Sequence, residues 1–344
     1  MRQKILLLVF ISFCFTHALA EDTVEILLKK GNEAREEGKQ REAISYYKQA
    51  IKKMPHLPKI HLNLGVSYIN IGKFGEAVEA LKKAVDINPN YDLAHFNLGV
   101  VYGKLDEYQE EVNAYKKAIS INPSYADAYY NLGLTYGKHG EFKEAIGAFK
   151  QVIQIDPHSA DVYVDLAVAY EGLGENEKAV ESYKKAIDIN PSYAKAYYNL
   201  GVVYGKLGNH QEEIDAYKKA ISIDPNNAQV HYGIGTAYIM LGKYQDAVSA
   251  YKKFIGIDPD LPQAYVNLGF AYRKLGHYED AVGAFKQAVK INPDFAKAYY
   301  NLGITYIIMD DQDSALEQYK VLGKINRDLA DKLYSKISDK SGKP

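Results

Sequence analysis

A proline recurs every 34 residues through most of the chain, and its register never shifts. The eight positions are Pro55, Pro89, Pro123, Pro157, Pro191, Pro225, Pro259 and Pro293. One further step falls on Arg327, where the neighbouring Ile325 and Asn326 persist although the proline is lost. A fixed period of this length indicates a tandem array in which each repeat forms one supersecondary unit. Nearly the whole chain is therefore committed to a single repeated structure.

Other residue types keep the same spacing within each repeat. A leucine is followed by a glycine and then a tyrosine, as in Leu98, Gly99 and Tyr102, and a small residue later precedes an aromatic one, as in Ala145 and Phe149. Leucine and tyrosine four residues apart share one face of an amphipathic helix. A glycine inside that helix costs about 1 kcal/mol relative to alanine, which indicates a close approach of two helices there.

Glycines separate the two helices of a repeat, and prolines end the second helix. A glycine adopts the positive φ that an inter-helix turn requires, whereas a proline cannot continue the helical hydrogen-bond ladder. We expect the polar residue after each proline to cap the next helix. The turn glycines are Gly72, Gly140, Gly174, Gly208, Gly242 and Gly276, and the expected N-caps are Asn90, Ser124, Ser192, Asn226, Asp260 and Asp294.

The order Leu-Gly-x-x-Tyr, Ala, aromatic residue and Pro on a 34-residue period resembles the tetratricopeptide repeat. The resemblance covers residues 24–329 and implies an all-α fold, a right-handed α-solenoid superhelix of helix-turn-helix repeats whose first helices line a concave groove. The usual tryptophan is absent, and tyrosine or histidine replaces it. Leu329, Leu333 and Ile337 share one face of an expected capping helix. The nine repeats span residues 24–57, 58–91, 92–125, 126–159, 160–193, 194–227, 228–261, 262–295 and 296–329, and residues 330–344 form the capping helix and a polar tail.

Residues 1–20 have the layout of a secretory signal peptide. A short basic start precedes an apolar run over residues 5–15, and a small-x-small cleavage pattern ends at Ala20. The apolar run is too short to span a bilayer, which needs roughly 20 apolar residues. We expect cleavage after Ala20 and an exported chain, periplasmic or secreted. Cys14 leaves a lipoprotein as the alternative, although the bulky Phe13 before it argues against that processing.

Charge and cysteine content exclude several classes of partner. The chain has 42 basic and 43 acidic residues, and removal of Arg2 and Lys4 with the signal leaves 40 basic against 43 acidic residues. This balance gives no electrostatic reason to bind nucleic acid or an anionic membrane surface. Cys14 is the single cysteine, so a mature chain that begins after Ala20 has no disulfide. We expect no membrane insertion of that mature chain.

Positions of the first helices outside the core predict a peptide-binding groove. One position forms an asparagine ladder, and a carboxamide suits the backbone of an extended peptide because it both donates and accepts. The ladder resembles that of the eukaryotic O-GlcNAc transferases. Alternatively, the asparagines satisfy neighbouring repeats or were copied by duplication, and part of the aromatic strip beside them belongs to the core between repeats. The ladder residues are Asn63, Asn97, Asn131, Asp165, Asn199, Asn267 and Asn301, the aromatic residues before them are Phe96, Tyr130, Tyr198, Tyr232 and Tyr300, and a basic edge is formed by Lys104, Lys138, Lys206 and Lys274.

Two carboxylates interrupt the series of small residues. Glu111 and Glu213 stand where most other repeats have alanine, as at Ala145. We expect each glutamate to extend to solvent from a slightly opened hairpin, because an ionised carboxylate is costly to bury. A functional role for both glutamates is the alternative.

No motif of catalysis interrupts the repeats. His61, His95 and His231 replace aromatic residues on layers that are about 8–10 Å apart, too far for one shared metal ion. Phosphate-binding loops, nucleophile elbows and HExxH motifs are absent from the sequence. We predict a protein without enzymatic activity, cofactor or metal that binds extended segments of other proteins, as an adaptor or scaffold for an envelope complex. Self-association into a structural scaffold is one alternative, and an accessory role beside a glycosyltransferase or polysaccharide-export system is the other.

Overall fold

The computed structural model describes residues 22–341 of the chain. The predicted signal peptide, residues 1–20, therefore lies outside the described residues. The chain divides into two compact parts, an N-terminal half that ends at Leu173 and a C-terminal half that begins at Gly174. Across residues 22–341, none of the helices combines the length and the apolar character needed to cross a membrane.

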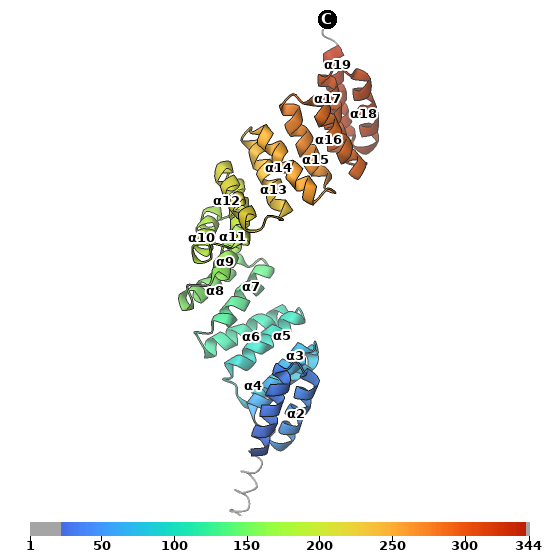
Figure 1. Ribbon diagram of the computed structural model, residues 1–344. Helices are drawn as coiled ribbons and strands as arrows, with labels where there is room; N and C mark the ends of the chain where they lie inside the picture. The colour runs from blue at the N-terminus through green and yellow to red at the C-terminus, as the bar shows by residue number, and fades with distance from the viewer. Residues whose placement is uncertain (1–21, 342–344) are drawn as a thin grey trace, which may run out of the picture. The chain divides into compact units, whose positions relative to one another are not determined.

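Each repeat contributes two helices, and short turns join them in chain order (Figure 1). The N-terminal half contains a helix over residues 22–36, followed by α2 Gln40–Lys53, α3 Pro58–Asn70, α4 Phe74–Ile87, α5 Asp92–Lys104, α6 Tyr108–Ile121, α7 Ala126–Lys138, α8 Phe142–Ile155 and α9 Ala160–Gly172. The C-terminal half contains α10 Asn176–Ile189, α11 Ala194–Lys206, α12 His210–Ile223, α13 Ala228–Met240, α14 Tyr244–Ile257, α15 Pro262–Lys274, α16 Tyr278–Ile291, α17 Ala296–Ile308, α18 Gln312–Ile325 and α19 Arg327–Ser341. The predicted all-α array of helical repeats with a final capping helix is confirmed.

Residues in the left-handed region close the turns between the two helices of a repeat. All six glycines predicted for these turns have positive φ, as Gly140 does at 77°. In repeats three and nine an aspartate stands at this position and also has positive φ, 57° at Asp106 and 62° at Asp310. A short polar side chain tolerates this region better than most residues do, although it lacks the freedom of glycine.

The N-caps predicted after the prolines are wrong by one residue. The backbone N–H of Ser124 donates to Oδ1 of Asn122 at 3.2 Å, so the asparagine before the proline closes a turn around it. Helix α7 then begins after Tyr125, whose side chain makes no cap hydrogen bond. The polar residue after the proline therefore belongs to this turn, and the helix starts only after the next residue.

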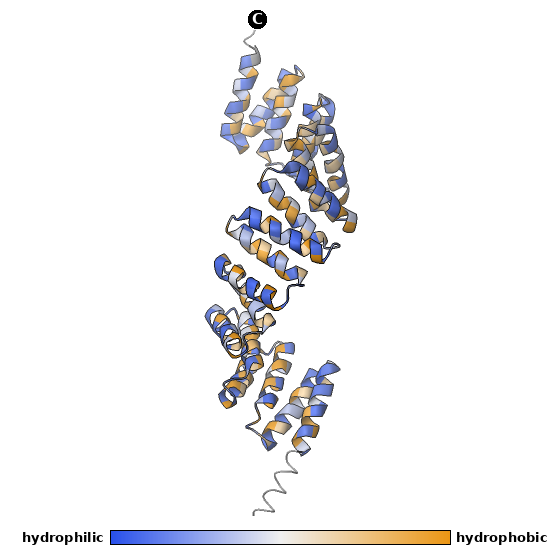
Figure 2. Ribbon diagram, turned by 90° about the vertical axis from the view of Figure 1, so that its left-hand side faces the viewer, coloured by the Kyte–Doolittle hydropathy of each residue, from blue (hydrophilic) through white to orange (hydrophobic). Residues whose placement is uncertain are grey.

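The two helices of a repeat pack most closely at the Leu-Gly step. A Cβ atom at Gly133 of α7 would lie 2.6 Å from Cε1 of Phe149 in α8, and the same contact recurs between Gly99 and Tyr115. Phe149 is only 2% exposed. The expected close approach is therefore confirmed, and the aromatic ring occupies the volume that the missing side chain leaves. Figure 2 shows that hydrophobic and hydrophilic residues alternate around the helices, as this packing requires.

Lysines join successive repeats on the outside of the core. Nζ of Lys116 in α6 lies 5.7 Å from the centre of the Tyr136 ring in α7. A cation over an aromatic face is worth about 0.5–1 kcal/mol at an exposed site. Six further pairs repeat the contact at 5.5 to 6.0 Å: Lys48–Tyr68, Lys82–Tyr102, Lys150–Tyr170, Lys184–Tyr204, Lys218–Tyr238 and Lys252–Tyr272.

Helix α19 covers the end of the C-terminal half. Leu333 is fully buried, and its Cδ2 atom lies 2.5 Å from the position that a Cβ of Gly303 in α17 would take. Ile337 is also buried, and Leu329 is partly buried against the same cluster. Leu333 thus replaces the aromatic residue that a second helix supplies in most other repeats.

Candidate functional site

First helices of adjacent repeats contact one another within each half. In the N-terminal half α3 contacts α5 and α7 contacts α9, and in the C-terminal half α11, α13, α15 and α17 contact their neighbours in that order. We call the surface that these helices present the first-helix face. The first helices carry every residue that the sequence predicts for the groove.

Three ladder asparagines are bonded to their own helices. The Nδ2 atoms of Asn97, Asn131 and Asn301 donate to the carbonyl oxygen four residues earlier, at 2.7, 2.8 and 2.8 Å. In Asn97 and Asn131 the Oδ1 atom accepts no hydrogen bond from residues 22–341. These two side chains therefore retain a free acceptor for a ligand, while Asn199 of α11 is half-buried.

Two other ladder asparagines are bonded to the preceding repeat. Asn63, which is 7% exposed, donates to Oδ1 of Asn32 at 3.1 Å, and that atom also accepts the Tyr47 hydroxyl. Asn267 donates to the hydroxyls of Tyr232 and Tyr251, both at 3.1 Å. These bonds match the alternative in which the asparagines meet the hydrogen-bonding needs of neighbouring repeats. The ladder therefore contains some asparagines that bond only within their own helix and others that bond to the repeat before them.

The aromatic residues before the ladder pack inward against the second helix of the same repeat. Phe96 contacts Tyr115 at 5.8 Å between ring centres and Tyr125 at 5.0 Å. The Tyr130 hydroxyl also donates to Oδ2 of Asp165 at 2.7 Å. Half-buried rings of this kind form the floor of the first-helix face. The other pairs are Tyr130 with Phe149, Tyr198 with Tyr217, and Tyr232 with Tyr251.

The predicted basic edge is exposed along the first helices, at Lys104, Lys138, Lys206 and Lys274. Lys138 forms an ion pair with Asp106 at 2.8 Å. Nζ of Lys274 lies 5.6 Å from the centre of the Phe270 ring. Two of the lysines are therefore held by neighbours on the same face.

A cavity of about 600 Å³ opens in repeats seven to nine of the C-terminal half. This volume lies within the range of cavities that hold small ligands or side chains. Its walls are mainly apolar, and α19 contributes one of them through Leu329. The lining residues are Thr236, Ile239, Tyr251, Val266, Asn267, Phe270, Lys297, Tyr300, Asn301 and Leu329. Three predicted groove residues, Asn267, Tyr300 and Asn301, are thereby brought together.

Arg273 supports this cavity, and the sequence reasoning missed it. Its guanidinium lies 5.7 Å from the Phe270 ring centre and donates to Oδ1 of Asn301 at 3.0 Å. Burial lowers the pKa of Arg273. No carboxylate among residues 22–341 lies within ion-pair distance of it. At this position the other repeats have isoleucine, as at Ile69, glycine, as at Gly137, or a charged residue, as at Arg35, so the repeat pattern did not single out Arg273.

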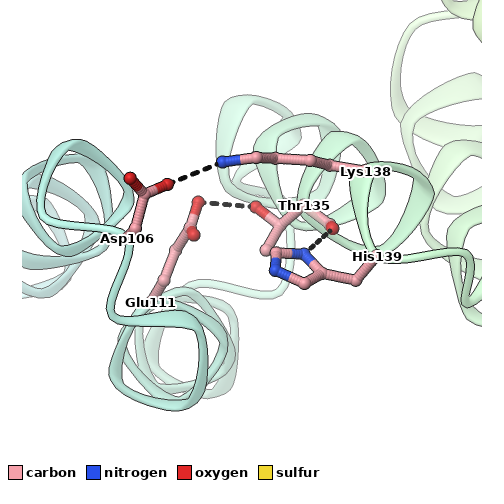
Figure 3. Close-up of polar contacts among 5 residues, drawn as sticks. All are labelled: Asp106, Glu111, Thr135, Lys138 and His139. Carbon is pink, nitrogen blue, oxygen red and sulfur yellow. Dashed lines mark hydrogen bonds and ion pairs between the residues drawn. The ribbon is translucent and has the colours of Figure 1, made fainter.

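A second cavity, of about 280 Å³, opens between repeats three and four of the N-terminal half. Glu111 lines it from α6, and its Oε1 atom accepts the Thr135 hydroxyl of α7 at 2.7 Å. Figure 3 shows this bond beside the ion pair of Asp106 with Lys138 and the contact of His139 with the Thr135 carbonyl. Glu111 is half-buried and lines a cavity that is open to solvent.

Glu213 is buried, so its predicted extension into solvent is wrong. It is 6% exposed, and its Oε2 atom lies 2.9 Å from Nδ1 of His210. Burial raises the pKa of Glu213, and the bond to His210 opposes this effect. Room for the carboxylate comes from Gly205, where a Cβ would lie 2.9 Å from Glu213. The glycine was visible in the sequence, but its proximity to the glutamate was not.

The predicted histidines replace aromatic residues and bond to the preceding repeat. A ring nitrogen of His61 lies 2.7 Å from the carbonyl oxygen of Pro55, and His95 repeats the contact with Pro89 at 3.1 Å. Among residues 22–341, no three His, Cys, Asp or Glu side chains are grouped closely enough to hold a metal ion.

The comparisons with known proteins identify the repeat. A family model described as Cilia and flagella-associated protein 70 C-terminal domain matches residues 15–231, well over half of the chain. Models described as TPR repeat and Tetratricopeptide repeat match residues 216–249, 235–276, 271–310 and 296–328. The chain therefore belongs to the family of tetratricopeptide repeat domains that the first model describes. No curated protein is significantly similar to the chain in sequence.

Several solved structures resemble parts of the chain. The structure described as MamA protein is 36% identical and covers 51% of this chain and 96% of its own, with a TM-score of 0.47. YrrB, described as a TPR protein with an unusual peptide-binding site, is 27% identical and covers 53% and 95%, with a TM-score of 0.49. The C-terminal part of a TPR repeat-containing protein from Cytophaga hutchinsonii is 18% identical, covers 70% and 99%, and has a TM-score of 0.63, which shows the shared fold. The repeat fold is typical of non-catalytic proteins that bind other proteins.

Proposed function

We propose that this tetratricopeptide-repeat protein binds an extended segment of a partner protein on its first-helix face, as an adaptor or scaffold for an envelope complex. The observation that carries the proposal is the cavity of about 600 Å³ in repeats seven to nine. Its apolar walls and few polar groups are the combination that seats one side chain and orients the backbone beside it. Tight recognition usually rests on such buried anchors rather than on the whole contact surface.

Each part of the cavity has a distinct role in this proposal. Val266, Phe270 and Ile239 surround a bulky apolar side chain, so its burial supplies most of the binding free energy. The Tyr300 hydroxyl forms no hydrogen bond with residues 22–341 and is available to the peptide backbone. Asn267 donates to the two tyrosine hydroxyls and accepts from Nε2 of Gln263 at 2.8 Å, so its carboxamide is fully bonded and keeps the wall in place.

Selection from a random peptide library against the full-length chain tests the proposal. We expect a family of peptides with one bulky apolar residue in common, and their affinity is then measured by fluorescence anisotropy. Phe270→Ala removes one of the aromatic rings that line the cavity and should weaken binding at least about tenfold, as loss of an anchor does. Phe74→Ala removes a partly buried ring of a second helix, away from the first-helix face, and serves as the matched control. Failure to select any peptide, or equal effects of the two variants, would sink the proposal.

Export is a separate part of the proposal and rests on the pattern of residues 1–20 alone. Expression of the full-length chain in a Gram-negative host, followed by fractionation and N-terminal sequencing, tests it. We expect a periplasmic product that begins at Glu21. A cytoplasmic product that retains Met1 would contradict export and leave peptide binding untouched.

A further inference from the structure

Glu111 is a charged side chain at a position where the repeat needs only a small one. Alanine fills this position in most repeats, as Ala145 does with no exposed area. The chain makes room for the carboxylate at Gly103, where a Cβ would lie 2.7 Å from Oε1 of Glu111. A carboxylate taken partly out of water loses hydration free energy unless a partner replaces the water. Packing alone therefore does not require the charge.

Residues 22–341 provide only part of the partner that the Glu111 carboxylate needs. Oε1 lies 2.7 Å from the Thr135 hydroxyl, whose single proton is shared with the carbonyl oxygen of Asn131 at 2.8 Å. Oε2 accepts no hydrogen bond from residues 22–341. Lys104 and Lys138 also line the cavity. The Nζ atom of Lys138 is paired with Oδ1 of Asp106 at 2.8 Å, and among residues 22–341 neither lysine lies within 4.0 Å of the Glu111 carboxylate. Figure 3 shows the two interactions side by side, with separate acceptors. One carboxylate oxygen thus remains available to a ligand in the cavity.

The apolar part of the cavity suits the stem of a long side chain whose charged end reaches Glu111. Val100 and the 40% exposed Leu134 line it with apolar surface, and the Tyr115 ring lines it beside Glu111. An arginine or lysine stem packs on aliphatic walls while its charged end binds a carboxylate or an aromatic face. The ladder residue Asn131, which also lines the cavity, retains a free Oδ1 acceptor for a peptide N–H.

Glu213 provides a comparison within the same chain. It occupies the equivalent position in repeat six, and Gly205 leaves room for its carboxylate as Gly103 does for Glu111. Repeat six, however, has His210 where repeat three has Tyr108, and His210 bonds to Glu213 at 2.9 Å. That carboxylate is 6% exposed and has its partner inside the protein. The two glutamates therefore differ in whether the protein itself supplies a side-chain nitrogen as the partner of the carboxylate.

We propose that the Glu111 cavity is a binding site for a cationic side chain, arginine or lysine, of a bound protein segment. The guanidinium or ammonium group donates to Oε2 of Glu111, and the methylene stem lies between Val100 and Leu134. This site lies in the N-terminal half and does not depend on the apolar cavity of repeats seven to nine. Loss of one site leaves the other intact.

A titration with a minimal probe tests this site. The probe is an acetylated and amidated Ala-Arg-Ala tripeptide, and its control carries citrulline, which keeps the shape of arginine but has no charge. Methyl NMR of the full-length chain follows the signals of Val100 and Leu134. We expect both signals to shift with the arginine peptide, and an affinity at least about tenfold weaker with citrulline, because a charge-assisted hydrogen bond is lost.

Variants separate recognition from folding. Glu111→Gln should weaken the affinity for the arginine peptide at least about tenfold. Glu111→Ala, which restores the residue that most other repeats have, should weaken it as much while the helix content measured by circular dichroism stays that of the wild type. Glu213→Gln should leave the titration unchanged. Equal binding of the two peptides, no shift with the arginine peptide, or wild-type affinity in Glu111→Gln would each overturn the proposal. Because the probe has no bulky apolar residue, the outcome is independent of the library selection.

Discussion

Substitution of Gly133 by alanine tests the packing on which every repeat depends. The new Cβ would lie 2.6 Å from Cε1 and 2.8 Å from Cδ1 of Phe149, distances that van der Waals radii do not allow. Phe149 is 2% exposed, and its ring also contacts Tyr130 with 6.0 Å between ring centres. The ring therefore cannot turn away, and the two helices α7 and α8 must separate.

The expected loss follows from two opposing contributions. Overpacking a filled core costs about 1–3 kcal/mol, whereas replacing a helical glycine by alanine contributes about 1 kcal/mol of stability. The net change for Gly133→Ala is then a destabilisation of up to about 2 kcal/mol. Gly147 in α8 of the same repeat is the matched control, because a Cβ there meets nothing within 4 Å. Gly147→Ala should stabilise the chain by up to about 1 kcal/mol.

Urea denaturation followed by far-ultraviolet circular dichroism measures both variants. Repeat arrays do not always unfold in one step, so hydrogen exchange of the α7 and α8 amides should accompany the denaturation curves. We expect faster exchange in Gly133→Ala and slower exchange in Gly147→Ala. If Gly133→Ala proves as stable as the wild type, the close contact with Phe149 does not limit the packing of the hairpin and the reasoning is refuted.

Three further predictions concern the turns, a buried carboxylate and the cap. Asp106→Gly relieves the strain of the left-handed backbone at φ 57° but removes the exposed ion pair with Lys138. Denaturation should therefore show that the free energy of unfolding rises by at most about 1 kcal/mol. Burial raises the pKa of the Glu213 carboxyl above its ordinary value of 4.5. Protonation of Glu213 therefore stabilises the folded chain fully below pH 4.5, and this stabilisation is lost as pH rises through the pKa of the folded state. Denaturation curves recorded across these pH values should show the loss in the wild type and not in Glu213→Gln. Leu333→Ala empties a fully buried site against Gly303, and it should cost about 2–5 kcal/mol and speed exchange in α17; unchanged exchange would show that α19 does not stabilise the end.

The helices could be predicted because their ends depend on residues with strict backbone preferences. Proline cannot stand in the interior of a helix without disrupting it, although it is tolerated in the first turn, and glycine adopts positive φ without strain. Gly140 and Pro157 therefore bracket α8, Phe142–Ile155, whatever lies around it. The prediction of an N-cap directly after the proline was wrong because a helix cap and an asparagine turn compete for the same few residues. The side chain of Asn122 closes its own turn first, and Ser124 becomes part of that turn.

The site could be predicted only in part, because the partners of a polar side chain come from other repeats. The asparagines recur at one position of the repeat, yet the Oδ1 acceptor of Asn267 is occupied by Gln263, whereas that of Asn131 remains free. Spacing along one helix gives the face of a residue but not what the next helix places against it. Arg273 was missed for the same reason, since its contacts to Asn301 and Phe270 depend on packing across two helices.

Departures from the repeat, rather than the repeat itself, locate both cavities. A residue found in every repeat meets a packing requirement common to all of them, so it does not indicate where one repeat binds a ligand. Glu111 occupies a position where alanine provides the packing in most other repeats, and Arg273 occupies one where Ile239 and Ile307 stand in the neighbouring repeats. Each adds a half-buried charge that packing does not need and that loses hydration on burial. The charge itself therefore requires a reason, and for Glu111 the free Oε2 atom beside an open cavity supplies one: a cation that arrives with the bound segment.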